Sequence, residues 1–274
     1  MTNYAKAILD YNRSLEIRER LYSEGKLLDE NALAVVYMNR GVAYYNMTNY
    51  AQAILDCNRS VEIRERLHSE GKLFGENGLA RAYMERGVVY QAMKNYAKAI
   101  LDLNRSLEMR ERLHSIGKLF DINDLAEVYK NRGSYYHDTS NYDEAILDFN
   151  RCTEIRERLH NEDKLYDKSD LAMVYGNKGI TLYKLGNVTE AIDNCINALR
   201  ILKKLFVNRL DVQKHYFACL DQTLLIINKE KNVNVYEDIL NDFLFPVLDL
   251  EKTEAAEAAQ NAILERLNLN KEKR

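Results

Sequence analysis

Residues 49–67 read NYAQAILDCNRSVEIRERL, and this stretch decides the fold. Its apolar positions recur in steps of three and four residues, which places them on one face of an α-helix. The opposite face carries charged pairs such as Asp56 with Arg59 and Glu62 with Arg66, each of which contributes only about 0.2–0.5 kcal/mol. The stretch therefore predicts an amphipathic helix that depends on burial of its apolar face.

The same stretch recurs along the chain with a period of 46 residues. The Asn-Tyr dipeptide that opens it occurs four times, at residues 3, 49, 95 and 141, and a fainter copy begins at Asn187. Residues 3–48 and 49–94 agree at 32 of 46 positions. A fixed period of roughly 20 to 50 residues is typical of an array of stacked supersecondary units, in which each unit contacts its neighbours. One proline and 11 glycines leave room for long helices and few loops.

A second helical pattern lies between successive copies of this stretch. Gly71 suits the left-handed residue that ends a helix, and Asn77 offers an N-cap for the helix that follows. A glycine inside a helix costs about 1 kcal/mol relative to alanine, so its recurrence in the second pattern needs a physical reason. We expect a neighbouring helix to approach closely at these glycines, which are Gly41, Gly87, Gly133 and Gly179.

The repeat resembles the tetratricopeptide repeat (TPR), a helix-turn-helix unit of about 34 residues. In its first helix the family's large aromatic residue falls on four tyrosines, and the family's small residue falls on the four glycines. The tyrosines are Tyr37, Tyr83, Tyr129 and Tyr175. The family's second-helix alanine falls on Ala7, Ala53, Ala99, Ala145 and Ala191. The resemblance covers residues 3–206. The longer period is similar to that of extended TPR variants such as those of kinesin light chain, which carry a similar Glu-Ile-Arg-Glu run.

The resemblance implies an all-α fold: a TPR-type α-solenoid of antiparallel helix pairs, wound as a right-handed superhelix, with a helical C-terminal cap. We predict the TPR array over residues 1–206, as a half repeat followed by four 46-residue repeats. The expected helix pairs cover 31–67, 77–113, 123–159 and 169–206. Residues 207–274 are predicted to hold a degenerate repeat and capping helices, with helices over 210–229, 233–248 and 251–267.

The chain opens on a predicted second helix over 2–21, with no first helix before it. We expect its apolar face to be uncovered, because nothing precedes it to pack there. The residues of that face are Tyr4, Ala7, Ile8, Tyr11 and Leu15. An open face of this kind allows a homo-oligomer that forms through the N-terminal helix.

Composition excludes several classes of protein. A net charge of -3, with 30% charged residues of both signs, argues against a nucleic-acid footprint, which needs a basic face. The apolar segments are far shorter than a membrane span, and the first residues lack a signal-peptide pattern. The four cysteines form no close pair and no metal-ligand spacing, so we expect a reducing, cytoplasmic setting.

Recurring polar residues do not predict an enzyme. His68, His114 and His160 stand 46 residues apart, which is too far for shared zinc ligation if packed helices lie about 10 Å apart. Cys57 and Cys195 occupy core positions and are expected to be inert thiols. The sequence lacks a phosphate-binding glycine loop, a nucleophile elbow and a zinc motif. We predict no catalytic residue, no cofactor and no metal site.

The positions that the resemblance places on the concave face vary from repeat to repeat, whereas packing positions recur. Such variation is typical of a groove that binds a non-repeating peptide or helix, although drift at exposed sites would also produce it. The predicted groove residues are Val35, Met38, Asn39, Val42, Tyr45, Arg81, Met84, Glu85, Val88, Glu127, Lys130, Asn131, His137, Met173, Asn177 and Tyr183. The apolar members are expected to supply contact area and the polar members to fix register.

These features predict a protein–protein interaction scaffold or adaptor. Some TPR domains grip a terminal carboxylate, and Lys130 and Asn177 match two places of that clamp. Because Ser134 replaces one of its asparagines, we do not expect the complete clamp. Two alternatives stay open, which are a self-assembling structural array and a regulatory domain of a larger protein.

Overall fold

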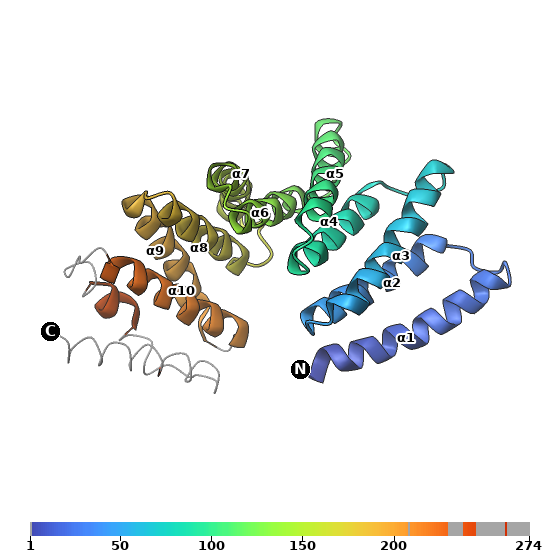
Figure 1. Cartoon of the computed structure of the whole chain (residues 1–274), viewed down its shortest axis with the longest axis horizontal. Helices are drawn as coiled ribbons and strands as arrows, with labels where there is room; N and C mark the ends of the chain where they lie inside the picture. The colour runs from blue at the N-terminus through green and yellow to red at the C-terminus, as the bar shows by residue number, and fades with distance from the viewer. Residues whose placement is uncertain (1, 208, 230–237, 245–260, 262–274) are drawn as a thin grey trace. The chain divides into compact units, whose positions relative to one another are not determined.

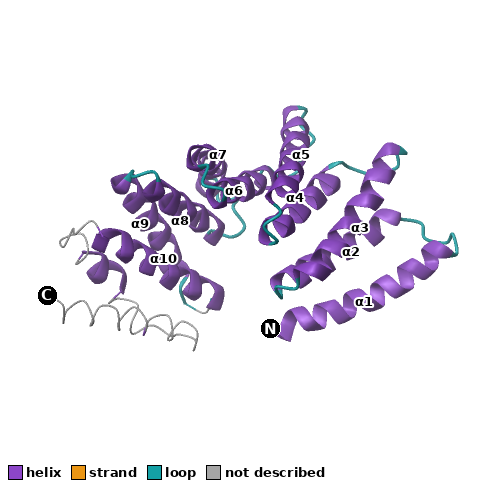
Figure 2. Cartoon of the chain, in the orientation of Figure 1, coloured by secondary structure: helices purple, strands orange, loops and turns teal. Residues whose placement is uncertain are grey.

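The computed structural model of the 274-residue chain describes residues 2–207, 209–229, 238–244 and 261. Every regular secondary-structure element in these residues is a helix, and no strand occurs among them (Figure 2). The chain forms two compact units, residues 1–135 and 136–274. The predicted division at residue 206 stays a prediction, and each compact unit is described by itself below.

Unit 1 contains helices α1 (Thr2–Ser23), α2 (Glu30–Asn46), α3 (Tyr50–Ser69), α4 (Asn77–Ala92) and α5 (Tyr96–Ser115), together with most of α6 (Asn123–Asp138). Consecutive helices pack against each other from α1 to α5, and they alternate in direction (Figure 1). Helix α2 also contacts α4, so the first helices of adjacent repeats are neighbours.

Unit 2 contains α7 (Tyr142–Asn161), α8 (Ser169–Lys184), α9 (Val188–Leu205) and α10 (Leu210–Lys229), followed by a short π-helix, Leu240–Leu244. Helix α8 packs against α7 and α9, and α10 packs against α9 and α8. The rings of Phe206, Tyr216 and Phe217 meet edge to face in the core of this unit. The predicted all-α fold of antiparallel helix pairs is therefore confirmed.

The predicted helices agree closely with the observed ones, including the helix over 210–229. The predicted helix over 233–248 lies mainly outside the described residues, and so does that over 251–267. Gly71 has φ +66° at the end of α3, which confirms its expected left-handed conformation. Asn77 does not cap α4: the cap residue is Glu76, without a side-chain cap bond. The amide of Asn77 instead bonds Arg110 and Asp124.

Three of the four recurring glycines, Gly41, Gly87 and Gly179, mark close helix approach. A Cβ atom on Gly41 would lie 3.0 Å from Cys57 Sγ, and one on Gly87 would lie 3.1 Å from Leu103 Cγ. At Gly179 the added atom would lie 2.6 Å from a sulfur atom and 2.9 Å from a backbone oxygen of α9. The glycines therefore let the two helices of a pair touch, as predicted.

Helix α1 is less open than expected. Ile8 and Leu15 are 9% and 3% exposed, and Leu15 packs with Leu33 and Tyr37 of α2. Tyr4 remains 43% exposed. The expectation of an uncovered apolar face is therefore wrong for Ile8 and Leu15, because the helix that follows covers them. No helix in the described part of the chain is both long and apolar enough to cross a membrane.

Candidate functional site

The first helices of unit 1 present the predicted groove residues in two ways. Along α2, Val35, Asn39, Val42 and Tyr45 are partly exposed, at successive steps of three or four residues. On α4, Arg81 is exposed, and Glu85 and Val88 are partly exposed; on α6, Glu127, Lys130 and Asn131 are partly exposed. Met38 and Met84 are buried, so they line the interior and offer little surface to a ligand.

The two methionines cover buried guanidinium groups that sequence reasoning missed. Arg64 is 1% exposed; it donates to Asn31 Oδ1 at 3.1 Å and to the Ser60 hydroxyl, and its Nη1 lies 3.8 Å from Met38 Sδ. Burial, reinforced by the charge of Arg81, lowers the pKa of Arg64 to about 10. Among the described residues no carboxylate forms an ion pair with Arg64.

The equivalent arginine of the next repeat connects neighbouring first helices. Arg110 donates to Asn77 Oδ1 at 3.1 Å on α4 and to the backbone oxygen of Asp124 at 2.7 Å on α6. Its Nη1 lies 3.4 Å from Met84 Sδ. A signal in the sequence could have found these residues. Arg64 lies three residues after Val61 and seven after Cys57, both core positions, so helical spacing places it on the buried face; Arg110 occupies the same place one period later.

Charged groove residues of unit 1 pair with one another. Arg81 Nε lies 3.7 Å from Glu85 Oε1 on α4, and Lys130 forms an ion pair with Glu127 on α6. Burial raises the pKa of Glu85 in spite of the nearby Arg81, because its side chain is only 20% exposed. This face therefore offers one exposed cation and one poorly hydrated carboxylate to a ligand.

Four predicted groove residues belong to unit 2. Met173, Asn177 and Tyr183 are partly exposed on α8, and Lys229 Nζ of α10 lies 5.8 Å from the centre of the Tyr183 ring. His137, at the end of α6, contacts the Thr181 hydroxyl at 2.9 Å through Nδ1, and burial lowers its pKa. The structure thus brings His137 and α8 together in this unit.

Recurring polar contacts hold the repeats of unit 1 in register. Arg40 of α2 donates to both carboxylate oxygens of Asp56 on α3 at 2.7 Å, and to Asn12 of α1 at 2.8 Å. Tyr37 of α2 donates to Glu19 of α1, and burial together with this bond raises the tyrosine pKa to about 12. Arg86 and Tyr83 repeat both contacts one period later. The first helices, which carry the predicted groove residues, are therefore fixed to their neighbours.

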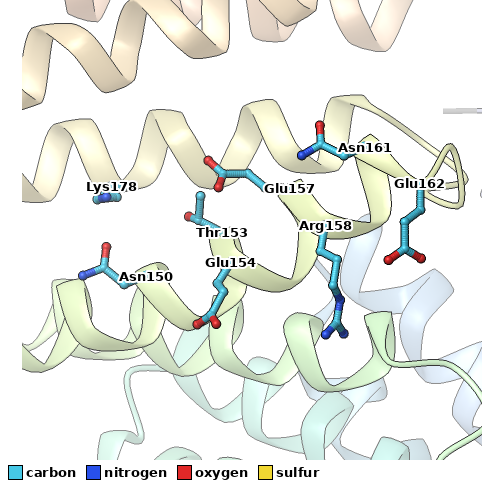
Figure 3. Close-up of a pocket in the computed structure, with 8 residues that line it drawn as sticks. All are labelled: Asn150, Thr153, Glu154, Glu157, Arg158, Asn161, Glu162 and Lys178. Carbon is cyan, nitrogen blue, oxygen red and sulfur yellow. The ribbon is translucent and has the colours of Figure 1, made fainter.

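The arginine contact changes in the fourth repeat, where Lys178 and Asn194 replace the arginine and the aspartate. An open cavity of about 540 Å³ lies beside Lys178. Figure 3 draws Lys178 of α8 across from Asn150 and Thr153 of α7. Three glutamates, Arg158 and Asn161 complete its polar lining. None of the predicted groove residues lines this cavity.

Groups with metal or nucleophile chemistry have structural positions. Within the described residues no set of three or more His, Cys, Asp or Glu side chains is arranged to hold a metal ion. Cys57 and Cys195 are each 1% exposed, which confirms their predicted burial. Burial raises the pKa of the Cys57 thiol to about 12 and that of Cys195 to about 11, so both remain protonated and unreactive at neutral pH.

Family models establish the class of the protein. Models of the tetratricopeptide repeat match residues 32–112, 78–158 and 171–209, which together make up more than half of the chain. The chain therefore belongs to the tetratricopeptide repeat family. No curated protein matches the sequence.

Solved structures share this fold at low sequence identity. BtubC (BKLC) from P. vanneervenii aligns with a TM-score of 0.69 at 15% identity, over 96% of this chain and 93% of that one. Apo RapI aligns with a TM-score of 0.60 at 18% identity, over 76% and 68% of the two chains. NprR aligns as the apo form from B. thuringiensis, with a TM-score of 0.61 at 15% identity, over 95% and 68% of the two chains. NprR in complex with its cognate peptide NprX aligns with a TM-score of 0.53 at 16% identity, over 95% and 67%.

Proposed function

We propose that this protein is a non-catalytic scaffold or adaptor that binds a peptide or helix along the exposed faces of its first helices. The observation that carries the proposal is the contrast between the two kinds of position in unit 1. Tyrosine, glycine and arginine contacts recur every 46 residues, whereas the partly exposed positions around Val42, Arg81, Val88 and Lys130 change from repeat to repeat. A surface whose chemistry differs from repeat to repeat can select one partner sequence. Because the surface is preformed, few of its side chains need to be ordered on binding.

The chemistry of this face indicates the kind of ligand. Val35, Val42 and Val88 offer apolar contact, and Arg81 offers an exposed guanidinium. Glu85 carries a carboxylate whose charge is poorly hydrated, so a donor group of the ligand would offset part of that cost. A peptide that alternates apolar side chains with a carboxylate and a donor would match these residues. NprR, a structural neighbour, binds its cognate peptide NprX, which supports a peptide as ligand.

The same proposal places the chain in a reducing, cytoplasmic setting. No disulfide joins the four cysteines of the chain, all of which lie in its described part, and Cys57, Cys152 and Cys195 are buried. End-to-end assembly through α1 is the weaker alternative, since Ile8 and Leu15 are already buried against α2.

The test is capture of partners from source-cell lysate, read by quantitative mass spectrometry. The native chain is compared with a groove variant, Arg81→Glu with Lys130→Glu, and with an outer-face variant, Arg59→Glu with Arg105→Glu. Both variants change charge by the same amount, and Arg59 and Arg105 are exposed on second helices. We expect proteins that the native chain and the outer-face variant both retain and the groove variant loses. Retention of the same proteins by all three chains would contradict the proposal, provided that all three have equal helical circular dichroism.

A further inference from the structure

The loops between repeats carry a row of fully exposed apolar side chains. Leu28, Phe74 and Phe120 of unit 1 stand 46 residues apart and are 102%, 98% and 103% exposed; Tyr166 of unit 2, at the same position of its repeat, is 103% exposed. We call these four residues the loop tips. A single exposed leucine needs no explanation, but a large apolar residue at the same position of every loop does.

Folding does not account for the loop tips. In three of the loops the residue before the tip points inward: Leu27 and Leu73 pack against the cores of their repeats, and Leu165 is 6% exposed. The tip itself contacts so little that a polar residue would serve the fold equally well. A tip directly before the cap Asp29 could act as a hydrophobic staple, yet the complete exposure of Leu28 excludes that role.

Internal comparison indicates that apolar character is retained at this position. The tips read Leu, Phe, Phe and Tyr, so their identity has changed while their class has not. Close by, the residue four places earlier reads Glu, Glu, Ile and Glu, and the residue one place later reads Asp, Gly, Asp and Asp. If recent duplication alone explained the pattern, the four tips would be the same residue. If the position drifted neutrally, some tips would be polar. Selection for an apolar contact therefore fits the pattern better.

In three of the four loops the lysine beside the tip is neutralised by a neighbouring glutamate, whereas in the third loop Ile116 stands in place of that glutamate. Lys26 pairs with Glu24 at 2.9 Å, Lys72 with Glu70 at 2.8 Å, and Lys164 with Glu162 at 2.8 Å. Loops neutralised in this way have no net attraction for an anionic membrane, which is bound through clusters of unpaired lysine and arginine rather than through a single lysine such as Lys118. Two like copies of the loops would not repel each other. A partner that contacts several tips at once must present apolar groups at the same spacing in space, and a second copy of this chain carries the same tips at the same spacing.

We propose that the loop tips of unit 1 form a two-fold contact with the loop tips of a second copy of the chain. Because both copies offer the same row, the contact is isologous and closes as a dimer. Each tip can bury on the order of 150–200 Å², so six tips bury about 1,000 Å². Specific stable interfaces bury about 1,200–2,000 Å². The dimer is therefore weak and forms only at high protein concentration. It leaves the groove of the proposed function free.

The test is sedimentation equilibrium over a wide range of protein concentration. For the native chain the weight-average mass rises from the 32.0 kDa monomer towards, and not beyond, twice that value. The loop variant Leu28→Gln, Phe74→Gln, Phe120→Gln weakens association by roughly tenfold or more. The matched control is Leu9→Gln, Leu55→Gln, Leu101→Gln, which alters leucines that are each 59% exposed on second helices. It associates like the native chain.

Four results would overturn the inference. The native chain could stay monomeric up to millimolar concentration, or its mass could grow past that of the dimer. The loop variant could associate as strongly as the native chain. Finally, the chain could bind phosphatidylserine vesicles in flotation assays in a way that depends on the loop tips. Circular dichroism establishes that the loop variant is folded. Because the tips lie outside the groove, loss of the dimer and loss of groove binding are separate outcomes.

Discussion

At the residue scale, buried arginines distinguish this chain from a simple apolar stack. Arg64 and Arg110, each 1% exposed, and the partly buried Arg40, whose side chain is 20% exposed, all bond residues of neighbouring helices. Buried charges are costly unless they are paired and hydrogen-bonded. Such contacts tolerate only one register between repeats, so they specify how adjacent repeats stack.

The pair formed by Arg40 and Asp56 allows a test of this role. The change Arg40→Met leaves the Asp56 carboxylate, which is 5% exposed, without its cation. Removal of one partner of a buried pair costs about 3 kcal/mol, so the free energy of unfolding falls by about that amount. Urea denaturation followed by circular dichroism measures it.

The fourth repeat supplies the control for this substitution, because it holds Lys178 and Asn194 at the equivalent positions. The double change Arg40→Lys with Asp56→Asn reproduces that pair and leaves no buried carboxylate. We expect it to lose less than half of what Arg40→Met loses. A double variant as unstable as the single one would show that the arginine acts by packing rather than by charge.

Glu85 makes stability depend on pH. Its folded-state pKa is raised by burial, so folding favours the protonated form, and the native chain loses stability as the pH rises through the folded pKa. Glu85→Gln removes that loss. The variant therefore melts above the native chain at pH 7, and the difference shrinks towards pH 4. A constant difference in melting temperature at both pH values would contradict this assignment.

Residue-scale prediction from the sequence succeeded for groups whose role follows from periodicity, such as Gly87 and Cys57. It missed Arg64, because a charged residue on an apolar face is ordinarily read as surface. It also placed Met84 on the groove, whereas the side chain covers Arg110. Side-chain direction at the boundary between core and groove depends on the neighbouring repeat, which a single helix pattern does not contain.

At the element scale, helix pairing depends on the small residues between first and second helices. Gly179→Ala adds an atom 2.9 Å from the backbone oxygen of Ala191, which cannot turn aside. Overpacking of this kind costs about 1–3 kcal/mol, so we expect a lower thermal midpoint.

Gly176 lies in the same helix, α8, and is the matched control, since a Cβ atom there meets nothing within 4 Å. Gly176→Ala is expected to raise stability by up to about 1 kcal/mol through helix propensity. Calorimetry of both variants measures the two shifts. If they moved in the same direction, the close-approach explanation would be wrong.

Helix existence and length were predictable because four copies of one pattern give the same answer four times. The ends of helices were less so. Asn77 has the residue type of an N-cap, but its amide is drawn into bonds with Arg110 and Asp124, and α4 begins without a side-chain cap bond. Tertiary contacts decided that boundary. Likewise, α2 covers the apolar face of α1. We had expected that face to be uncovered because no helix precedes α1 in the sequence.

At the scale of the whole molecule, the proposed function depends on which positions are free to vary. The 46-residue contacts fix the repeats, and the partly exposed first-helix positions diversify on that frame. The groove residues were predicted as a set because the family resemblance assigns them to one face, and that assignment stays a prediction. The sequence did not reveal that these residues pair with one another, as Arg81 does with Glu85, or that Met38 is buried. Both features follow from how the helices pack.

The most direct test of the central claim is binding of one peptide, selected from a random display library on the native chain, measured by fluorescence anisotropy. We expect Arg81→Glu with Lys130→Glu to weaken the dissociation constant by at least roughly tenfold, as loss of one or two well-placed contacts does. Arg59→Glu with Arg105→Glu should leave it within about twofold, since surface charges away from a contact change affinity little. Equal weakening by both variants, or by neither, would contradict a binding site on the first helices.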